Sequence, residues 1–273
     1  MADSINLSSA TRTNLLALQN TTGLISRTQE RLSTGLKVNS AIDDAIAFFQ
    51  ARSLTDRAGD LATLKDSIDQ GVSALETAVS GIEAIRDIVE QMKGLALGAK
   101  SDANAANRSK AAVQFNDLRL QLDNLATDTS YKGTNLIKGT SPANLKVTFS
   151  EDGSSTLTIS GVASDSSGLN IDTAITNWVN DGNIDSALNN LDSALTTLRS
   201  TASTLGSNAS VLTLRLDFTK NLIGALEEGA AKLVNADLNE ESANLLTLQT
   251  RQQLGTIGLS IAQQSEQSIL RLF

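Results

Sequence analysis

The sequence predicts a mainly α-helical protein: a long antiparallel helical hairpin or coiled-coil bundle, with a small β-hairpin tip and with helical N and C termini that pair with each other. Three observations support this fold class. An apolar stripe runs almost unbroken from residue 184 to residue 233. The 273 residues include a single proline, Pro142, so little interrupts a helix. Two short segments of alternating polar and apolar residues flank Asp152-Gly153 in the middle of the chain.

The first forty residues predict one helix followed by a turn. The apolar stripe of this segment is sparse, and the Thr, Ser and Asn residues around it would leave the helix marginal by itself. A turn-rich break follows at residues 33–40. Ser40, with Asp43 and Asp44 after it, predicts that the next helix begins there with acidic residues in its first turn.

Residues 61–96 carry a second long stripe, in which apolar positions again alternate by three and four. A further helix with Phe115 and Leu122 on its apolar face is expected to end near Tyr131. The core positions predicted on the long stripe are Leu61, Leu64, Ile68, Leu75, Ile82 and Val89.

Between Gly139 and Gly182 the character of the sequence changes. Lys146–Ser150 and Thr156–Ser160 alternate polar and apolar residues on either side of an Asp-Gly pair, which is a typical signal of a β-hairpin. Ser, Gly, Asp and Asn dominate the rest of this segment, so we expect a surface excursion and not a second core.

The last long stripe, from Ile184 to Leu233, has only Thr219 as a polar member. Its mean spacing of 3.5 residues keeps one face turned toward a partner helix, as in a coiled coil. At 1.5 Å per residue the helix would be roughly 75 Å long, more than a compact domain needs. The core positions predicted on it are Leu188, Leu195, Leu205, Leu212, Leu216 and Leu226.

Composition excludes several kinds of chemistry. Hydrophobic residues make up 40% of the chain and aromatic residues only 3%, so the core is aliphatic, as in helical bundles. The chain has no Cys and no His, which removes disulfides, thiolate metal sites and the commonest general base. We therefore expect no cofactor and no metal. The net charge of −8 argues against nucleic acid as a partner.

The pair Asp43-Asp44 is the only paired carboxylate that merits a catalytic interpretation. Because no His, Cys or glycine-rich phosphate loop accompanies it, a helix start is the better interpretation, and we do not expect an enzyme. No segment approaches the roughly 20 apolar residues of a membrane span. The N-terminal segment lacks the pattern of a cleavable signal peptide, which leaves a cytosolic protein or one exported by another route.

The two ends of the chain are amphipathic and mildly complementary in charge. Residues 1–40 hold four basic and two acidic side chains, and residues 236–273 hold two basic and four acidic ones. Either each terminal helix packs on its own subunit, or the helices order only in an assembly of the ring or filament type. The apolar residues assigned to assembly are Leu15, Leu18, Ile25, Leu32, Leu36, Leu245, Leu248, Leu259, Ala262, Ile269 and Phe273.

Residues 32–45 resemble the signature of the bacterial flagellin family, which reads Leu-Ser-Ser-Gly-Leu-Arg-Ile-Asn-Ser-Ala-Lys-Asp-Asp-Ala. Further similar stretches are residues 114–137, 236–242, 249–255 and 268–273, so the resemblance covers both ends of the chain in order. The short middle is similar to that of short alphaproteobacterial flagellins, which lack large outer domains. The residues that carry the signature are Gly35, Asn39, Ser40, Asp43 and Asp44.

This resemblance implies a structural subunit of the extracellular flagellar filament that serves swimming motility. It implies that residues 1–40 and 236–273 are inner-tube helices, that residues 41–138 and 184–235 form a coiled-coil rod, and that residues 139–183 form a variable outward tip. It also implies export of the unfolded chain by the flagellar type III apparatus. The implied partners are further copies, other flagellins, the hook-associated junction and cap proteins, and a cytoplasmic export chaperone.

The chain departs from the family at the site where many flagellins contact an innate-immune receptor. Where the family reads Arg-Val-Arg-Glu-Leu-Ala, residues 91–96 place Gln91 at the first Arg and Gly94 at the Glu. These losses of charge predict weak or absent receptor activation. The hook–filament junction protein is the alternative function, because it shares the terminal patterns; an intracellular coiled-coil scaffold is a further one.

Overall fold

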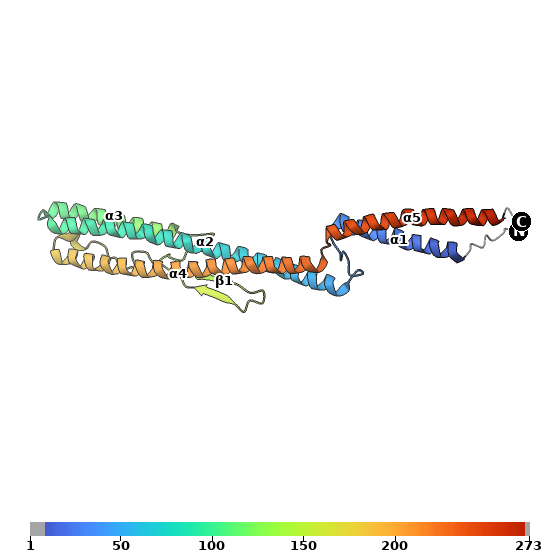
Figure 1. Ribbon diagram of the computed structural model, residues 1–273. Helices are drawn as coiled ribbons and strands as arrows, with labels where there is room; N and C mark the ends of the chain where they lie inside the picture. Colours follow the sequence, from blue (N-terminus) through green and yellow to red (C-terminus); the bar gives the residue numbers. More distant parts are fainter. Residues whose placement is uncertain (1–8, 271–273) are drawn as a thin grey trace. The chain divides into compact units, whose positions relative to one another are not determined.

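The computed structural model describes residues 9–270, and its helices and strands follow the order α1, α2, α3, β1, β2, η1, α4 and α5 (Figure 1). The chain divides into two compact units. The terminal unit comprises residues up to 57 and from 225 onward, and the central unit comprises residues 58–224. The predicted fold class, mainly helical with one small hairpin, is confirmed.

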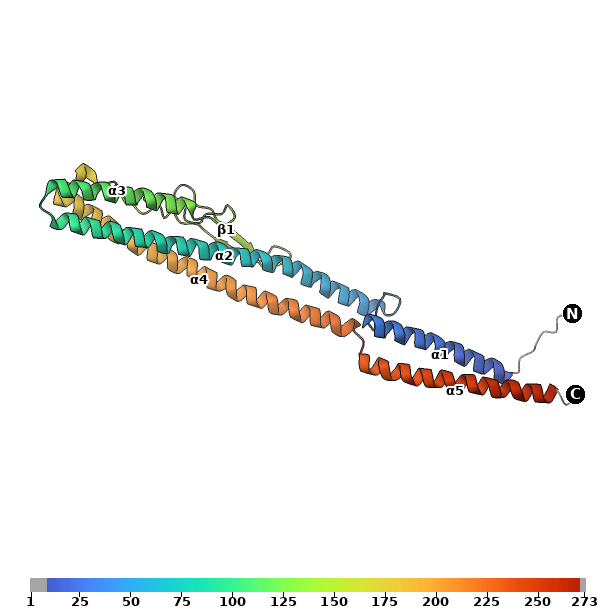
Figure 2. The same cartoon turned by 90° about the horizontal axis from the view of Figure 1, so that it is seen from above.

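In the terminal unit, α1 (Ser9–Thr34) and α5 (Leu238–Leu270) lie side by side and antiparallel, as both views show (Figures 1 and 2). The start of α2 and the end of α4 complete this unit. A β-bridge between Leu36 and Asn235 joins the two chain segments that connect these helices. The terminal helices therefore pair within one subunit.

In the central unit, α2 (Ala45–Ser101), α3 (Ala105–Asp128) and α4 (Asp181–Val234) surround one apolar core. Helices α2 and α4 run antiparallel, since Lys93 pairs with Asp192 at 2.5 Å and Lys100, one heptad farther along α2, pairs with Asp185. Figure 2 shows α3 folded back along the end of α2.

The core positions predicted from the two long stripes point inward. Nine are buried, and Leu64, Leu188 and Leu226 are half-buried. Even Thr219, the polar member of the last stripe, is buried, because its hydroxyl donates to the Arg215 carbonyl one turn back. The nine buried positions are Leu61, Ile68, Leu75, Ile82, Val89, Leu195, Leu205, Leu212 and Leu216.

The predicted hairpin is present, as β1 (Leu145–Thr148) and β2 (Thr156–Ile159), with Val147 opposite Leu157. Val147 lies so close to α2 that a Cβ at Gly71 would stand 2.8 Å from Val147 Cγ2 and 3.2 Å from Leu212 Cδ1. Glycine at position 71 thus lets the hairpin and α4 approach the same point of α2.

The predicted start of α2 was wrong. Helix α2 begins at Ala45 and not at Ser40, because the Asp43 carboxylate accepts from the Asn39 and Ser40 amides at 3.1 and 3.0 Å and closes a separate turn. The amide of Ala47 then donates to Asp44, which caps the helix.

Helix α3 ends at Asp128, before Tyr131. The buried Asn135 side chain donates to the Ala126 and Thr127 carbonyls at 2.8 and 3.0 Å, so these terminal carbonyls are satisfied without another helical turn. Tyr131 and Thr134 instead form a tight turn around Gly133, whose φ is +82°.

Candidate functional site

Most of the residues assigned to assembly are at least partly shielded from water. Of those described, all lie on α1 or α5 except Leu36, which follows α1. Ile25 is buried, and seven others are half-buried. Only Leu15 is exposed among those described; the side chain of Ile269 and the whole of Phe273 lie outside the described part of the structure. The half-buried members are Leu18, Leu32, Leu36, Leu245, Leu248, Leu259 and Ala262.

Polar contacts fix how α1 and α5 align. Arg31 Nη1 lies 2.8 Å from Glu241 Oε1, and the side chain of Glu241 is only 10% exposed. Thr22 Oγ1 accepts from Gln252 at 3.4 Å, farther along the same pair. Because the guanidinium and carboxylate neutralise each other where water is scarce, loss of either leaves a poorly solvated charge.

A second apolar face of the terminal helices remains exposed. On α5, Leu246, Leu254, Ile257 and Ile261 are each more than half exposed. Their separations of eight, three and four residues place them on one side of the helix. On α1, Leu16 is also exposed. We define the four α5 residues Leu246, Leu254, Ile257 and Ile261 as the outer apolar face. The sequence analysis did not predict this face, although its helical spacing can be read from the sequence.

The signature residues build the connection between α1 and α2. Gly35 has φ +71°, and its carbonyl accepts from the Ala236 amide at 2.9 Å. Hydrogen bonds from the Ser40 amide, the Ser40 hydroxyl and the Asn39 amide hold the pKa of the Asp43 carboxyl below its usual value. The side-chain amide of Asn39 donates to the Glu30 carboxylate at 3.3 Å. These residues therefore shape a turn, and no catalytic pair results.

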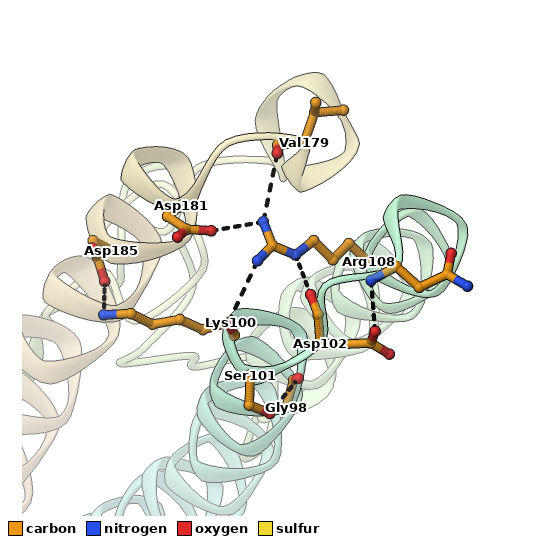
Figure 3. Close-up of polar contacts among 9 residues, drawn as sticks. Gly98, Lys100, Ser101, Asp102, Arg108, Val179, Asp181 and Asp185 are labelled. Carbon is orange, nitrogen blue, oxygen red and sulfur yellow. Dashed lines mark hydrogen bonds and ion pairs between the residues drawn. The ribbon is translucent and has the colours of Figure 1, made fainter.

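At one end of the central unit, Arg108 of α3 joins three segments (Figure 3). Its Nε donates to the Asp102 carbonyl at 2.5 Å, and Nη1 lies 2.7 Å from Asp181 at the start of α4. Longer contacts of 3.5 Å reach the carbonyls of Lys100 and Val179. Since the Arg108 side chain is only 13% exposed, this fork is well placed to hold the segments together.

The segment that returns from the hairpin to α4 is held by polar side chains of α3. Asp123 accepts from the amide and hydroxyl of Ser166, Arg119 Nε donates to the Ile171 carbonyl, and Asn116 accepts from the Ala174 amide. Their spacing places Asn116, Arg119 and Asp123 on one side of α3.

The same segment ends in η1 (Ile175–Trp178), a left-handed turn in which Thr176, Asn177 and Trp178 all have positive φ. Trp178 is fully buried and packs edge-on against Phe115, with ring centroids 4.9 Å apart. Non-glycine residues seldom adopt this conformation, so the burial of the indole offsets a backbone cost.

Gln91 and Gly94, the two positions at which the sequence departs from the receptor-contact motif of the family it resembles, lie on α2. Gln91 and Gly94 are exposed, and Met92 between them is buried. A Cβ at Gly94 would meet no other atom within 4 Å. These two positions line an open groove of about 530 Å³ between α2 and α3.

The described residues hold no arrangement that suggests catalysis. Among residues 9–270, no group of three or more His, Cys, Asp or Glu side chains is placed to hold a metal ion. In the same part of the chain, no helix combines the length and the apolar character that crossing a bilayer requires.

Comparison with known proteins adds to this geometry. Residues 5–142 match the model of the bacterial flagellin N-terminal helical region, and residues 188–273 match that of the C-terminal helical region. The chain is 33% identical to flagellin FljM of Caulobacter vibrioides, over 99% of this chain and 98% of FljM. It is 31% identical to the flagellin of Brucella melitensis, over 99% of each.

Among solved structures, a putative flagellar hook-associated protein from Vibrio parahaemolyticus is similar, with a TM-score of 0.61. The likeness covers 71% of this chain and 100% of that one at 14% sequence identity, so it concerns the fold alone.

Proposed function

This chain belongs to the bacterial flagellin family, and from that membership we propose how its surfaces build a filament. As a flagellin it is a structural subunit of the flagellar filament outside the cell, not an enzyme, and it assembles with copies of itself or with other flagellins. The proposal concerns which residues make the contacts between subunits and which hold the subunit together.

The outer apolar face of α5 contacts neighbouring subunits. The observation that carries this assignment is the exposure of Leu246, Leu254, Ile257 and Ile261 along one side of α5. Four neighbouring large apolar side chains exposed to water are unfavourable for a monomer. Burial of a fully exposed side chain of this size gains about 1.5–3 kcal/mol, and each of these four still has more than half of its surface to bury. A filament offers that burial at every subunit.

The residues that the sequence assigned to assembly contribute in a different way. Leu18, Ile25 and Leu248 hold α1 against α5, so they present the outer apolar face in a fixed orientation. Leu245→Asp and Ile269→Asp are still expected to give soluble monomers that do not polymerise. For Leu245 the reason is loss of the helix pair.

The division of the chain follows its helices. Residues 1–40 and 236–273 form the inner tube of the filament, and residues 41–138 and 184–235 form the coiled-coil shell around it. Residues 139–183 point outward. The position of the hairpin and of the polar return segment supports this division. Both fall in residues 139–183, and neither forms part of the α1–α5 pair.

The chain reaches the filament as an unfolded polypeptide through the flagellar type III apparatus. A cytoplasmic chaperone binds the C-terminal helix before export, as an amphipathic helix bound in a groove. The junction and cap proteins of the hook contact the same family of terminal helices. The absence of Cys is compatible with passage of an extended chain, since no disulfide obstructs it.

The filament subunit is favoured over the hook–filament junction protein. The carrying observation is the match to named flagellins over 99% of this chain at 31 to 33% identity. The likeness to the hook-associated protein extends to the fold only, at 14% identity.

The receptor contact is weak in this chain. Gln91 and Gly94 are exposed, so their lack of charge is presented directly to any partner. A reporter-cell assay with endotoxin-free protein should give little signal, and Gln91→Arg with Gly94→Glu should raise it. Strong signalling by the unaltered chain would contradict the assignment.

Seeded polymerisation tests the assembly proposal. Purified chain is mixed with short filament seeds and viewed by negative-stain electron microscopy, and long uniform filaments are expected. Leu254→Asp should remain monomeric with an unchanged circular dichroism spectrum, because residue 254 is exposed. The matched control Gln253→Asp should polymerise. Persistent monomers or short stubs from the unaltered chain would support the junction protein instead, and normal filaments from Leu254→Asp would remove the outer apolar face from the interface.

A further inference from the structure

The terminal unit carries an apolar projection at the start of α2. Ile42, Ile46 and Phe49 are 96%, 73% and 62% exposed, respectively. Ile46 and Phe49 are three residues apart and share a side of the helix, and Ile42 lies in the turn before it. We call these three residues the knob. The flagellin signature that residues 32–45 resemble has Lys where this chain has Ile42, so the apolar character here belongs to this chain and not to the signature.

The same unit carries an apolar groove of about 370 Å³. Six of the residues that line it are Leu36, Val38, Phe48, Ala51, Ala230 and Val234. The groove is therefore bounded by the connection after α1, the start of α2 and the end of α4, all of which belong to the terminal unit. Small residues on α4 leave the groove open, and apolar side chains form most of its walls. The polar and charged residues that line the remainder are Asn39, Arg52, Thr55 and Glu227.

The knob and the groove use different sides of α2. At about 100° per residue, Phe48 projects roughly 160° from Ile46. Ala51 projects roughly 140° from Ile46 and roughly 160° from Phe49. Phe48 and Phe49 are roughly 100° apart and meet edge to face, with ring centroids 5.5 Å apart, so the Phe48 ring forms the border between the knob and the groove. A subunit that inserts its knob into one neighbour thus keeps its groove free for another. Two different, complementary surfaces on one subunit make a head-to-tail contact, which generates an open helical assembly when the rotation does not close.

We propose that the knob of one flagellin copy inserts into the groove of the next copy in the filament. This inference rests on the proposed function, in which copies of this chain surround one another. A second copy of the chain is expected to fill the groove, because each copy carries an exposed projection that is apolar, as most of the groove lining is. Alone in water the knob leaves three large side chains solvated, so assembly is the state that covers them.

Cysteine cross-linking tests this contact without background, because the chain has no Cys. Ile46→Cys and Ala231→Cys chains are prepared separately, mixed, polymerised on seeds and treated with a mild oxidant. Ala231 also lines the groove. We expect a covalent dimer on a non-reducing gel, formed in filaments and not in the unpolymerised mixture. A single chain with both substitutions should give a ladder of multimers.

The matched control pairs Ile46→Cys with Ser200→Cys, an exposed residue of the central unit, and should give no dimer. Filaments without the Ile46–Ala231 dimer would overturn the contact while leaving the filament function intact. Dimers from Ile46→Cys alone would mean that two knobs meet and would also overturn it. If the unaltered chain forms no filaments on seeds, the proposed function fails and this contact fails with it.

A second set of variants tests the knob without cysteine substitutions, which could themselves impair assembly. Ile42→Lys changes a side chain that is 96% exposed, so the monomer should keep its circular dichroism spectrum and melting temperature. Its filament yield on seeds should fall at least tenfold, whereas Ile42→Leu should polymerise normally. Equal yields from the two variants would refute a role of the knob.

Discussion

Leu18 of α1 lies directly over Gly255 of α5: a Cβ at residue 255 would stand 2.7 Å from Leu18 Cδ2 and 3.1 Å from its Cγ. The glycine is therefore a site of close approach between the two terminal helices and not a weakness of the helix. Three residues away, a Cβ added at Gly258 would meet no atom within 4 Å, so the two glycines differ in a way that sequence spacing does not reveal.

Gly255→Leu should separate α1 from α5. Overpacking at a contact of this kind costs about 1–3 kcal/mol, and the gain in helix propensity over glycine, at most about 1 kcal/mol, does not offset it. Limited proteolysis should cut α1 and α5 faster than in the unaltered chain. Gly258→Ala is the control and should leave the cleavage rate equal or slower.

Glu241→Gln should destabilise the same helix pair. Arg31, 28% exposed, would keep its charge without a carboxylate partner, at a cost of about 1.5–3 kcal/mol. Hydrogen exchange of the α1 amides should accelerate. Replacement of both partners, Arg31→Met with Glu241→Leu, should recover most of the loss, because no charge is then left in the contact. An equal effect of Glu240→Gln, at an exposed neighbour, would count against the ion pair.

Arg108→Ala should loosen the end of the central unit. The carbonyl of Asp102 and the carboxylate of Asp181 lose the same donor group, so we expect a loss of about 1.5–3 kcal/mol in the free energy of unfolding by urea. Arg108→Lys should recover only part of it, since an ammonium group cannot reach all the acceptors as a planar fork does. Arg199→Ala, on the exposed side of α4, should change the free energy by less than about 0.5 kcal/mol.

Asp152 makes the hairpin sensitive to acid. Hydrogen bonds from the Ser150 hydroxyl, the Ser154 amide and the Ser154 hydroxyl lower the pKa of this carboxyl from 3.8 to about 2. Because the folded pKa lies below the unfolded one, the stability contributed by the ionised group is complete above about pH 4 and is lost as the pH falls toward 2. The carboxyl carbon shift of Asp152, followed by NMR, should have its midpoint near 2. A midpoint near 3.8 in the folded chain would contradict these hydrogen bonds.

Gly206→Ala should stabilise α4. A Cβ at this position meets nothing within 4 Å, so the substitution gains helix propensity of up to about 1 kcal/mol without a clash. Gly71→Ala is the opposite case, because its Cβ would press on Val147 and Leu212. The midpoint temperature of thermal unfolding should therefore rise for Gly206→Ala and fall for Gly71→Ala.

The sequence predicted the helices, the hairpin and the long seam because periodicity reports directly on burial. It assigned the side of α5 that α1 covers but not the second, exposed side, since Leu248 and Leu254 have the same chemistry. The covered side is the one on which Gly255 meets Leu18 and Glu241 pairs with Arg31. It misplaced the start of α2 because Asp43 binds the amides behind it in place of a cap at Ser40. The role of Arg108 was not predicted, because a single arginine has no sequence pattern that identifies its partners. The three segments that it joins meet only in the folded chain.

The ion pairs between α2 and α4 recur at an interval of one heptad, and this has a consequence for alignment. Lys93 and Lys100 are seven residues apart, as are Asp185 and Asp192, so a heptad slip of one helix along the other would lose one ion pair and remake the other. The ion pairs and the heptad spacing of the apolar residues would therefore also permit an alignment in which α2 and α4 are shifted by seven residues. Arg108 at the end of the bundle and the close approach at Gly71 do not repeat, and they select a single alignment of the two helices.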